Sequence, residues 1–264
     1  MADTLYLSLW YPNLRLESLP DKLVAVLSAF AGHGGEAKVY SATVWPVSWN
    51  ETPFFERVYG RMATTQPGGE LPGADPRVAV EEATELLHDD YAYEFQIGWS
   101  LWELETGAEA GQLPRKATAD PSTRPPDGGL AQDDSVALGV QNDHKRICAE
   151  SDAANGTKWE VGGTSRWARG PRLVRVTGYG PLFDEGAYEQ DGHIKIDFGN
   201  DGPFLEEEAD LGKVGARHVE ENVRQLIELA SAVEKASGAT ARLLWSELGE
   251  SLASRLAERL GLGN

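Results

Sequence analysis

The 264-residue chain has few cysteines and few basic side chains, and each shortage excludes a class of protein. Its single cysteine, Cys148, cannot form an internal disulfide framework, so we expect a protein of the reducing cytoplasm. Its 24 Lys and Arg face 42 Asp and Glu, which gives a formal net charge of −18. This balance argues against nucleic-acid binding, because phosphate contacts require clustered Lys and Arg.

Long apolar runs are also missing. No stretch approaches the ~20 consecutive apolar residues that a membrane-spanning helix requires. The first residues, Met1 to Thr4, lack the basic region that precedes the apolar core of a secretory signal. We therefore expect a cytoplasmic location and no membrane partner.

Several catalytic and cofactor motifs are absent as well. The chain contains no Walker loop, no G-x-G-x-x-G after a strand, no G-x-S-x-G elbow, no H-E-x-x-H and no paired C-x-x-C. These absences weigh against nucleotide, dinucleotide, serine-hydrolase and structural-zinc sites. We therefore expect no cofactor, with a calcium or magnesium ion as the alternative considered below.

What the chain does contain is typical of a globular protein. Hydrophobic residues make up 41% of it, and they include eight Trp, eight Tyr and seven Phe. The acidic balance is compatible with a basic protein partner, with cation binding, or simply with solubility.

The C-terminal third has the clearest secondary-structure pattern. Apolar and polar residues alternate over 193–198, which predicts a half-buried strand. A 3.6-residue period from Ala216 to Val233 predicts a long helix ended by Gly238. A short buried strand over Ala241–Leu248 and a closing helix around 252–260 follow. A strand, a helix and a second strand suggest a split β-α-β unit.

The N-terminal third repeats this order. A strand over Leu5–Trp10, a helix from Leu19 to Phe30 and a strand over Lys38–Val47 echo the C-terminal pattern. Antiparallel pairing of the strand at Leu173–Tyr179 with the strand at His193 is the simplest topology. The chain is thus predicted to be α+β, with mainly antiparallel sheet and helices packed on one face. Two related split β-α-β halves are the alternative arrangement.

Domain boundaries follow from composition. We expect a single globular unit over 1–264. The alternative is an N-terminal half over 1–106 and a C-terminal half over 171–264, joined by a Gly/Pro-rich, loop-rich connector over 107–170.

The most strand-like run suggests an aromatic ligand site. Every odd position from Tyr91 to Leu101 is apolar, and the pattern then changes phase, which requires a bulge, a bend or a change of environment. Four residues around this change could line a pocket for an apolar or cationic ligand: Tyr93, Trp99, Trp102 and Glu103. The simpler interpretation is that the aromatic rings fill a thick core.

The strand at 193–198 carries a second candidate site. His193, Lys195 and Asp197 point to the same side of the strand, because alternate residues share a face. An imidazole, an amine and a carboxylate on a concave face could serve as general acid and base. The simpler interpretation is a solvated strand face, since no nucleophile signature lies nearby.

The end of the same strand partly matches a calcium loop. Asp197, Asp201 and Glu208 occupy the first, fifth and twelfth positions, and Gly202 occupies the sixth. Against this, Gly199 occupies the third position of the pattern, where an acid or amide is required, and a strand rather than a helix precedes the loop. The simpler interpretation is a tight turn followed by solvated glutamates.

These patterns favour a non-enzymatic cytoplasmic binding or interaction protein that uses an acidic surface and aromatic residues. Its partner would be a protein, a basic one by charge, or a small molecule. The alternative is an acid/base or divalent-cation-assisted hydrolase centred on His193, Lys195 and Asp197.

Overall fold

Eight strands pair into one sheet in the part of the chain that the structure describes, and every pairing is antiparallel. The computed structural model describes residues 3–60, 73–104, 158–162, 165–205, 211–247 and 252–259. The strands are β1 (Thr4–Trp10), β2 (Gly35–Pro46), β3 (Phe55–Val58), β4 (Tyr91–Leu104), β5 (Lys158–Gly162), β6 (Ser165–Tyr179), β7 (Ile194–Asn200) and β8 (Ala241–Ser246). Their order is β3-β2-β4-β6-β7-β1-β8, and β5 pairs with β6.

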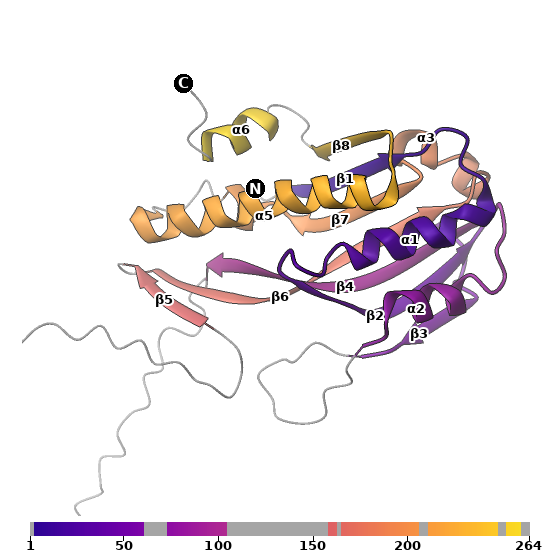
Figure 1. Ribbon diagram of the computed structural model, residues 1–264, viewed down its shortest axis with the longest axis horizontal. Coiled ribbons are helices and arrows are strands. Elements are labelled where there is room, and N and C mark those ends of the chain that lie inside the picture. The colour runs from indigo at the N-terminus through magenta and orange to yellow at the C-terminus, as the bar shows by residue number, and fades with distance from the viewer. Residues whose placement is uncertain are drawn as a thin grey trace, which may run out of the picture.

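Helices cover one face of this sheet. The described helices are η1 (Leu16–Ser18), α1 (Leu19–Ser28), α2 (Pro76–Ala83), η2 (Phe183–Glu185), α3 (Tyr188–Asp191), α4 (Gly202–Leu205), α5 (Gly212–Ser237) and α6 (Leu252–Arg259). Figure 1 shows α1, α2 and α5 lying over the same side of the strands. The predicted α+β class, with antiparallel sheet and helices on one face, is confirmed. No helix among the described residues has the length and apolar character needed to cross a membrane.

The core lies between these helices and the sheet. Alternate residues of β1 and β7 are fully buried, as the period-two patterns predict. Helix α5 buries a stripe that includes Val219, Val223 and Leu226, and it begins at Gly212, four residues earlier than Ala216. It ends at Gly238, whose φ of 69° provides the left-handed residue expected at a helix end.

The predicted split β-α-β unit is present at the C-terminus. β7 and β8 both pair antiparallel with β1, so they run parallel to each other on either side of it, and α5 connects them. The predicted antiparallel pairing of β6 with β7 is also confirmed. β1 and β2 are likewise parallel and joined by a helix, but β4, β6 and β7 lie between them. The two helix-linked strand pairs therefore differ in spacing.

This topology brings the two ends of the chain into one sheet. β1, from the N-terminal half, lies between two strands of the C-terminal half. The connector predicted over 107–170 falls largely outside the described residues, which include from it only β5 and the first part of β6. The long loop predicted between Thr106 and Asp134 also lies outside them.

Two predictions about burial are wrong. β8 was expected to be buried, but its first three residues are exposed, and Leu243 keeps 53% of its surface. The reason is that β8 is the last strand of the sheet and pairs only with β1. The apolar spacing after Asp75-Pro76 also predicts a helix that ends near His88 with Leu86 on its inner side, but Leu86 is 66% exposed because α2 ends at Ala83.

The phase change in β4 arises from a change of environment rather than from a bulge between β4 and β6. Their register is unbroken from Ala92↔Tyr179 to Leu104↔Trp167. The pairing of β2 with β4 ends at Trp99, and β7 leaves β6 near Arg175. The remaining narrow ribbon is free to twist more strongly than a wide sheet. Leu101 and Trp102 are both buried there, although they are consecutive.

Candidate functional site

Three loops meet at one end of the sheet, on the right of Figure 1. They follow β2 (47–54), precede β4 (84–90) and follow β6 (180–192). The backbone N–H of Val47 donates to the carbonyl of Asp90 at 2.8 Å, and that of Asp184 donates to the carbonyl of Val47 at 2.7 Å. We call the surface of these three loops the acidic rim.

The acidic rim carries charge of one sign only. Its residues include no Lys and no Arg. Its carboxylates are Glu51, Glu85, Asp89, Asp90, Asp184, Glu185, Glu189 and Asp191. Asp191 is paired with Lys195 of β7 at 2.6 Å. The carboxylates on these three adjacent loops together create a negative local potential, which attracts cationic partners.

Large apolar side chains are exposed among these carboxylates. The exposed ones are Val47, Trp49, Phe54, Leu86 and Leu182. Two of them rest on other aromatic residues: the ring centroid of Trp49 lies 5.0 Å from that of the buried Phe183, and that of Phe54 lies 4.7 Å from that of the partly buried Tyr91. Exposed apolar groups surrounded by polar ones are typical of interaction sites.

The backbone of the acidic rim is strained at three positions. Val47, Asp184 and Glu185 have φ angles of 59°, 46° and 56°. This left-handed region is unfavourable for residues other than glycine, above all for a β-branched valine. Such strain persists only where the surrounding structure enforces it, and it concentrates at functional sites. Here the hydrogen bond between Val47 and Asp184 joins two of the strained positions.

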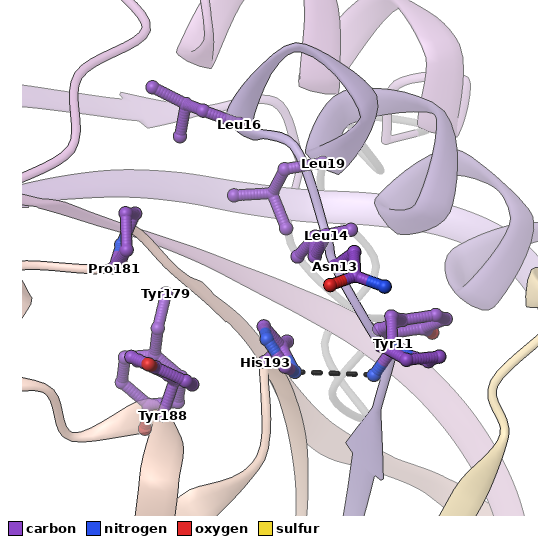
Figure 2. A pocket seen from close by; sticks show the side chains of 10 residues that line it. Tyr11, Asn13, Leu14, Leu16, Leu19, Tyr179, Pro181, Tyr188 and His193 are labelled. Carbon is purple, nitrogen blue, oxygen red and sulfur yellow. Dashed lines mark hydrogen bonds between the residues drawn. The ribbon is translucent and has the colours of Figure 1, made fainter.

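A pocket of about 310 Å³ lies beside the acidic rim (Figure 2). It opens between the loop after β1 and the connection from β6 to β7. Its lining consists of Tyr11, Pro12, Asn13, Leu14, Leu16, Leu19, Tyr179, Pro181, Tyr188 and His193. None of these side chains is an Asp, Glu, Lys or Arg, so the pocket contrasts with the charged rim next to it.

His193, a predicted catalytic residue, lies in this pocket. Its Nδ1 accepts a hydrogen bond from the backbone N–H of Tyr11 at 3.2 Å, and its ring packs 4.8 Å from that of Tyr188. Partial burial lowers the pKa of His193 below its ordinary value of 6.5. Because Nδ1 accepts a hydrogen bond, the neutral ring carries its proton on Nε2.

Lys195 and Asp197 follow on the same face of β7, as predicted, but each has different partners. Lys195 Nζ lies 2.6 Å from Asp191 Oδ2. Asp197 accepts a hydrogen bond from the N–H of Gly199 at 2.7 Å and lies 3.7 Å from Arg175. The structure thus places His193, Lys195 and Asp197 in a row, and no contact among the described residues joins them.

The residues of the predicted aromatic site lie mainly in the core. Tyr93, Trp99 and Trp102 are at most 2% exposed. The ring of Trp102 stacks on that of His218, with centroids 3.9 Å apart. Glu103 is half exposed and forms an ion pair with Arg172 at 3.3 Å. The described structure therefore does not bring the carboxylate and the three rings into one cavity.

The predicted cation site is built differently from a calcium loop. Asp201 is buried, and its Oδ1 accepts a hydrogen bond from the N–H of Asp3 at 3.0 Å. Its Oδ2 lies 3.4 Å from Arg255. Glu208 lies outside the described residues, and within them no group of three or more His, Cys, Asp or Glu is arranged to hold a metal ion.

Sequence reasoning missed the acidic rim. Each of its loops looks like an ordinary polar connection, and the run His88-Asp89-Asp90 by itself predicts only the end of a helix. The one available signal was the pairing of acidic neighbours, Asp89-Asp90 and Asp184-Glu185, beside exposed leucines. Nothing local showed that the loops 47–54, 84–90 and 180–192 come together.

Comparison of the chain with family models, curated proteins and solved structures finds no match in any of the three. The function must therefore be inferred from the geometry of the acidic rim and the adjacent pocket.

Proposed function

We propose that this chain is a non-enzymatic binding protein whose acidic rim binds a basic protein partner. One observation carries the proposal: three hydrogen-bonded loops present eight carboxylates, no Lys or Arg, and five exposed apolar side chains on one end of the sheet. A negatively charged surface attracts a positively charged protein and increases the rate of its association.

The apolar residues indicate a protein rather than a small cation. A simple cation needs only the carboxylates, whereas Val47, Leu86 and Leu182 offer contact area that only a large partner can cover. Trp49 is anchored on Phe183, which suits it to the centre of an interface, where aromatic residues contribute most. Backbone hydrogen bonds between the loops reduce the ordering cost of association.

The acid/base hydrolase has less support. Lys195 is engaged by Asp191, Asp197 lies near Arg175, and His193 bonds the backbone of Tyr11. A shared catalytic role would need the three side chains to converge on one substrate atom. We therefore place binding ahead of catalysis.

A charge-reversal experiment tests the proposal. The wild-type protein, used as bait in an extract of the cells that encode it, is compared with a double variant, Asp89→Lys with Glu189→Lys. Both residues are exposed on the acidic rim. The matched control is Glu81→Lys with Glu228→Lys, which changes the net charge equally but on exposed positions of α2 and α5.

We expect a basic partner that the wild type and the control retain and that the rim variant loses. Raising the salt from about 0.05 M to about 0.5 M should weaken capture, because salt screens exposed charges. A second variant, Leu86→Ser with Leu182→Ser, should weaken capture without changing charge. Equal loss in the rim and control variants would show that only the net charge matters and would overturn the proposal.

A further inference from the structure

The imidazole of His193 directs a polar group into the pocket beside the acidic rim. With Nδ1 of His193 engaged by the N–H of Tyr11, the other ring nitrogen is the free one. Figure 2 shows it on the opposite side of the ring, facing the space bounded by Leu19, Pro181 and Tyr188. Within the described residues no hydrogen bond is made to this nitrogen, so its N–H is available to a ligand.

The remaining lining selects for an uncharged molecule. Burial raises the pKa of Tyr11 to about 12 and also raises that of Tyr179, so both phenols stay neutral. The charged groups nearest these rings already have partners: Lys22 donates to the carbonyl of Ser237 at 2.6 Å and lies over the Tyr11 ring, and Asp191 pairs with Lys195 and accepts from the Tyr179 hydroxyl at 3.2 Å. A charged ligand would lose hydration in the pocket without gaining a partner.

The walls of the pocket favour a flat ring. Tyr188 lies against His193 at an interplanar angle of 33°, and Tyr11 meets the same imidazole nearly edge-on at 70°. Aromatic walls of this kind bind planar rings through stacked and edge-to-face contacts. The volume of about 310 Å³ is at the lower end of small-molecule sites.

The pocket is also held in shape by the backbone. Gly192, which precedes His193, has a φ of 86° and lies so close to β1 that an added Cβ would meet the backbone nitrogen of Leu9 at 2.8 Å. This contact and the bond from Tyr11 to His193 fix the β6–β7 connection against the end of β1. A preformed cavity binds small molecules at a lower ordering cost.

We infer that this pocket is a binding site for a small, neutral, aromatic molecule whose hydrogen-bond acceptor receives the Nε2–H of His193. The inference does not rest on the proposed function: it concerns a different class of ligand, and none of the lining side chains is among the carboxylates or exposed apolar residues of the acidic rim, although Pro181 and Tyr188 belong to one of its loops.

Three probes that share a phenyl ring test the ligand class. Benzamide is neutral and has an acceptor, benzoate is an anion, and benzylammonium is a cation. Each is titrated into the full chain labelled with ¹⁵N, and the signals of the Tyr11 amide and the His193 ring are followed by NMR. We expect benzamide to shift both signals with a dissociation constant on the order of 1 mM, as is reasonable for so small a ligand. The dissociation constants of the two charged probes should be at least about fivefold higher than that of benzamide.

Benzylammonium is the sharpest comparison, because the net charge of −18 favours a cation everywhere on the surface. Preference for benzylammonium over benzamide, or absence of benzamide shifts at Tyr11 and His193, would overturn the inference.

Two variants test the residues. His193→Phe keeps a ring and removes the donor, so benzamide should bind about fivefold more weakly, the loss of one hydrogen bond. The matched control is His88→Phe, the same change at an exposed histidine outside the pocket, and it should bind benzamide like the wild type.

His193→Phe also removes the acceptor for Tyr11, so a variant that leaves this bond intact is needed. Leu16→Trp places a larger side chain at a half-buried lining position and should abolish benzamide binding while the His193 signals stay in place. Unchanged benzamide affinity in Leu16→Trp would show that the probe binds elsewhere and would refute the site.

Discussion

The side-chain amide of Asn222 on α5 bonds both backbone groups of Trp102 on β4. Its Oδ1 accepts from the Trp102 N–H at 3.0 Å, and its Nδ2 donates to the Trp102 carbonyl at 2.7 Å. Beyond Trp99 the strand β4 has lost β2, so this edge would otherwise have no neighbour there. The amide takes the place of the missing strand and ties the helix layer to the sheet at the point where the β4–β6 ribbon twists away.

Replacing Asn222 with alanine should therefore be costly. Three buried backbone groups lose a partner, the N–H and carbonyl of Trp102 and the carbonyl of Pro203. Each group left unsatisfied costs about 1–3 kcal/mol. We expect Asn222→Ala to lower the free energy of unfolding by roughly 3 kcal/mol, as measured by urea denaturation. Arg224→Ala, two residues away in an exposed ion pair with Glu220, should change it by less than about 0.5 kcal/mol. Similar losses in the two variants would contradict this role for the amide.

Local pattern was enough to predict the fold class because its signals are periodic. The alternation in β7 and the 3.6-residue stripe of α5 each specify an element and the face that it buries. The position of a strand within the sheet has no periodic signal in the sequence. The run Leu243-Leu244-Trp245 is compatible with a central buried strand and with an edge strand, and β8 is an edge strand.

The candidate site was less predictable for a related reason. His193 could be singled out from the sequence, since its neighbours Lys195 and Asp197 share its face. Its pocket could not, because Tyr11 lies 182 positions away in the chain and contributes a backbone group. The acidic rim likewise depends on the meeting of loops whose separate sequences look like ordinary turns.

Val47 combines strain with exposure, so relieving the strain should stabilise the protein. A β-branched residue at a φ of 59° costs about 1–2 kcal/mol of stability. Glycine adopts this conformation without that cost, but the greater conformational entropy of glycine in the unfolded chain offsets part of the stabilisation. We expect Val47→Gly to raise the free energy of unfolding by about 1 kcal/mol and to weaken capture of a basic partner. The measurement is thermal or urea unfolding combined with the pull-down described above.

Val58 provides the matched control. It is 58% exposed, against 56% for Val47, but it lies in the strand β3 and has no positive φ. Val58→Gly should therefore lower stability by about 1 kcal/mol. If both glycine variants lost stability, relief of backbone strain at Val47 would not be the main effect of Val47→Gly on the free energy of unfolding.

His193 should make the protein less stable in mild acid. Burial lowers the pKa of His193 in the folded state below the 6.5 expected of the unfolded chain, so the unfolded chain binds the proton more readily. The stability contribution of the neutral ring is present above about pH 6.5 and decreases as the pH falls below it. His193→Gln, whose amide cannot titrate, should flatten this part of the curve of unfolding free energy between about pH 7.5 and 5. Identical curves for the variant and the wild type would refute the assignment.

Glu94 should show the opposite dependence on pH. Its side chain is 13% exposed on β4 and lies 3.5 Å from Arg175. Burial raises the pKa of Glu94 above 4.5, and the charge of Arg175 opposes this only in part. The folded state therefore holds the proton more tightly than the unfolded chain, and this contribution to stability is complete below about pH 4.5 and is lost as the pH rises through the folded pKa.

Glu94→Gln removes the charge that burial disfavours and keeps the shape of the side chain. Relative to the wild type, the variant should gain stability as the pH rises from about 4 to 7, and the difference should disappear at the acidic end. Urea denaturation at several pH values measures it, with the exposed Glu228→Gln as a control expected to stay within about 0.5 kcal/mol of the wild type throughout. A variant less stable than the wild type at pH 7 would show that attraction to Arg175 outweighs the cost of burying Glu94, and that the carboxylate is held as a structural ion pair.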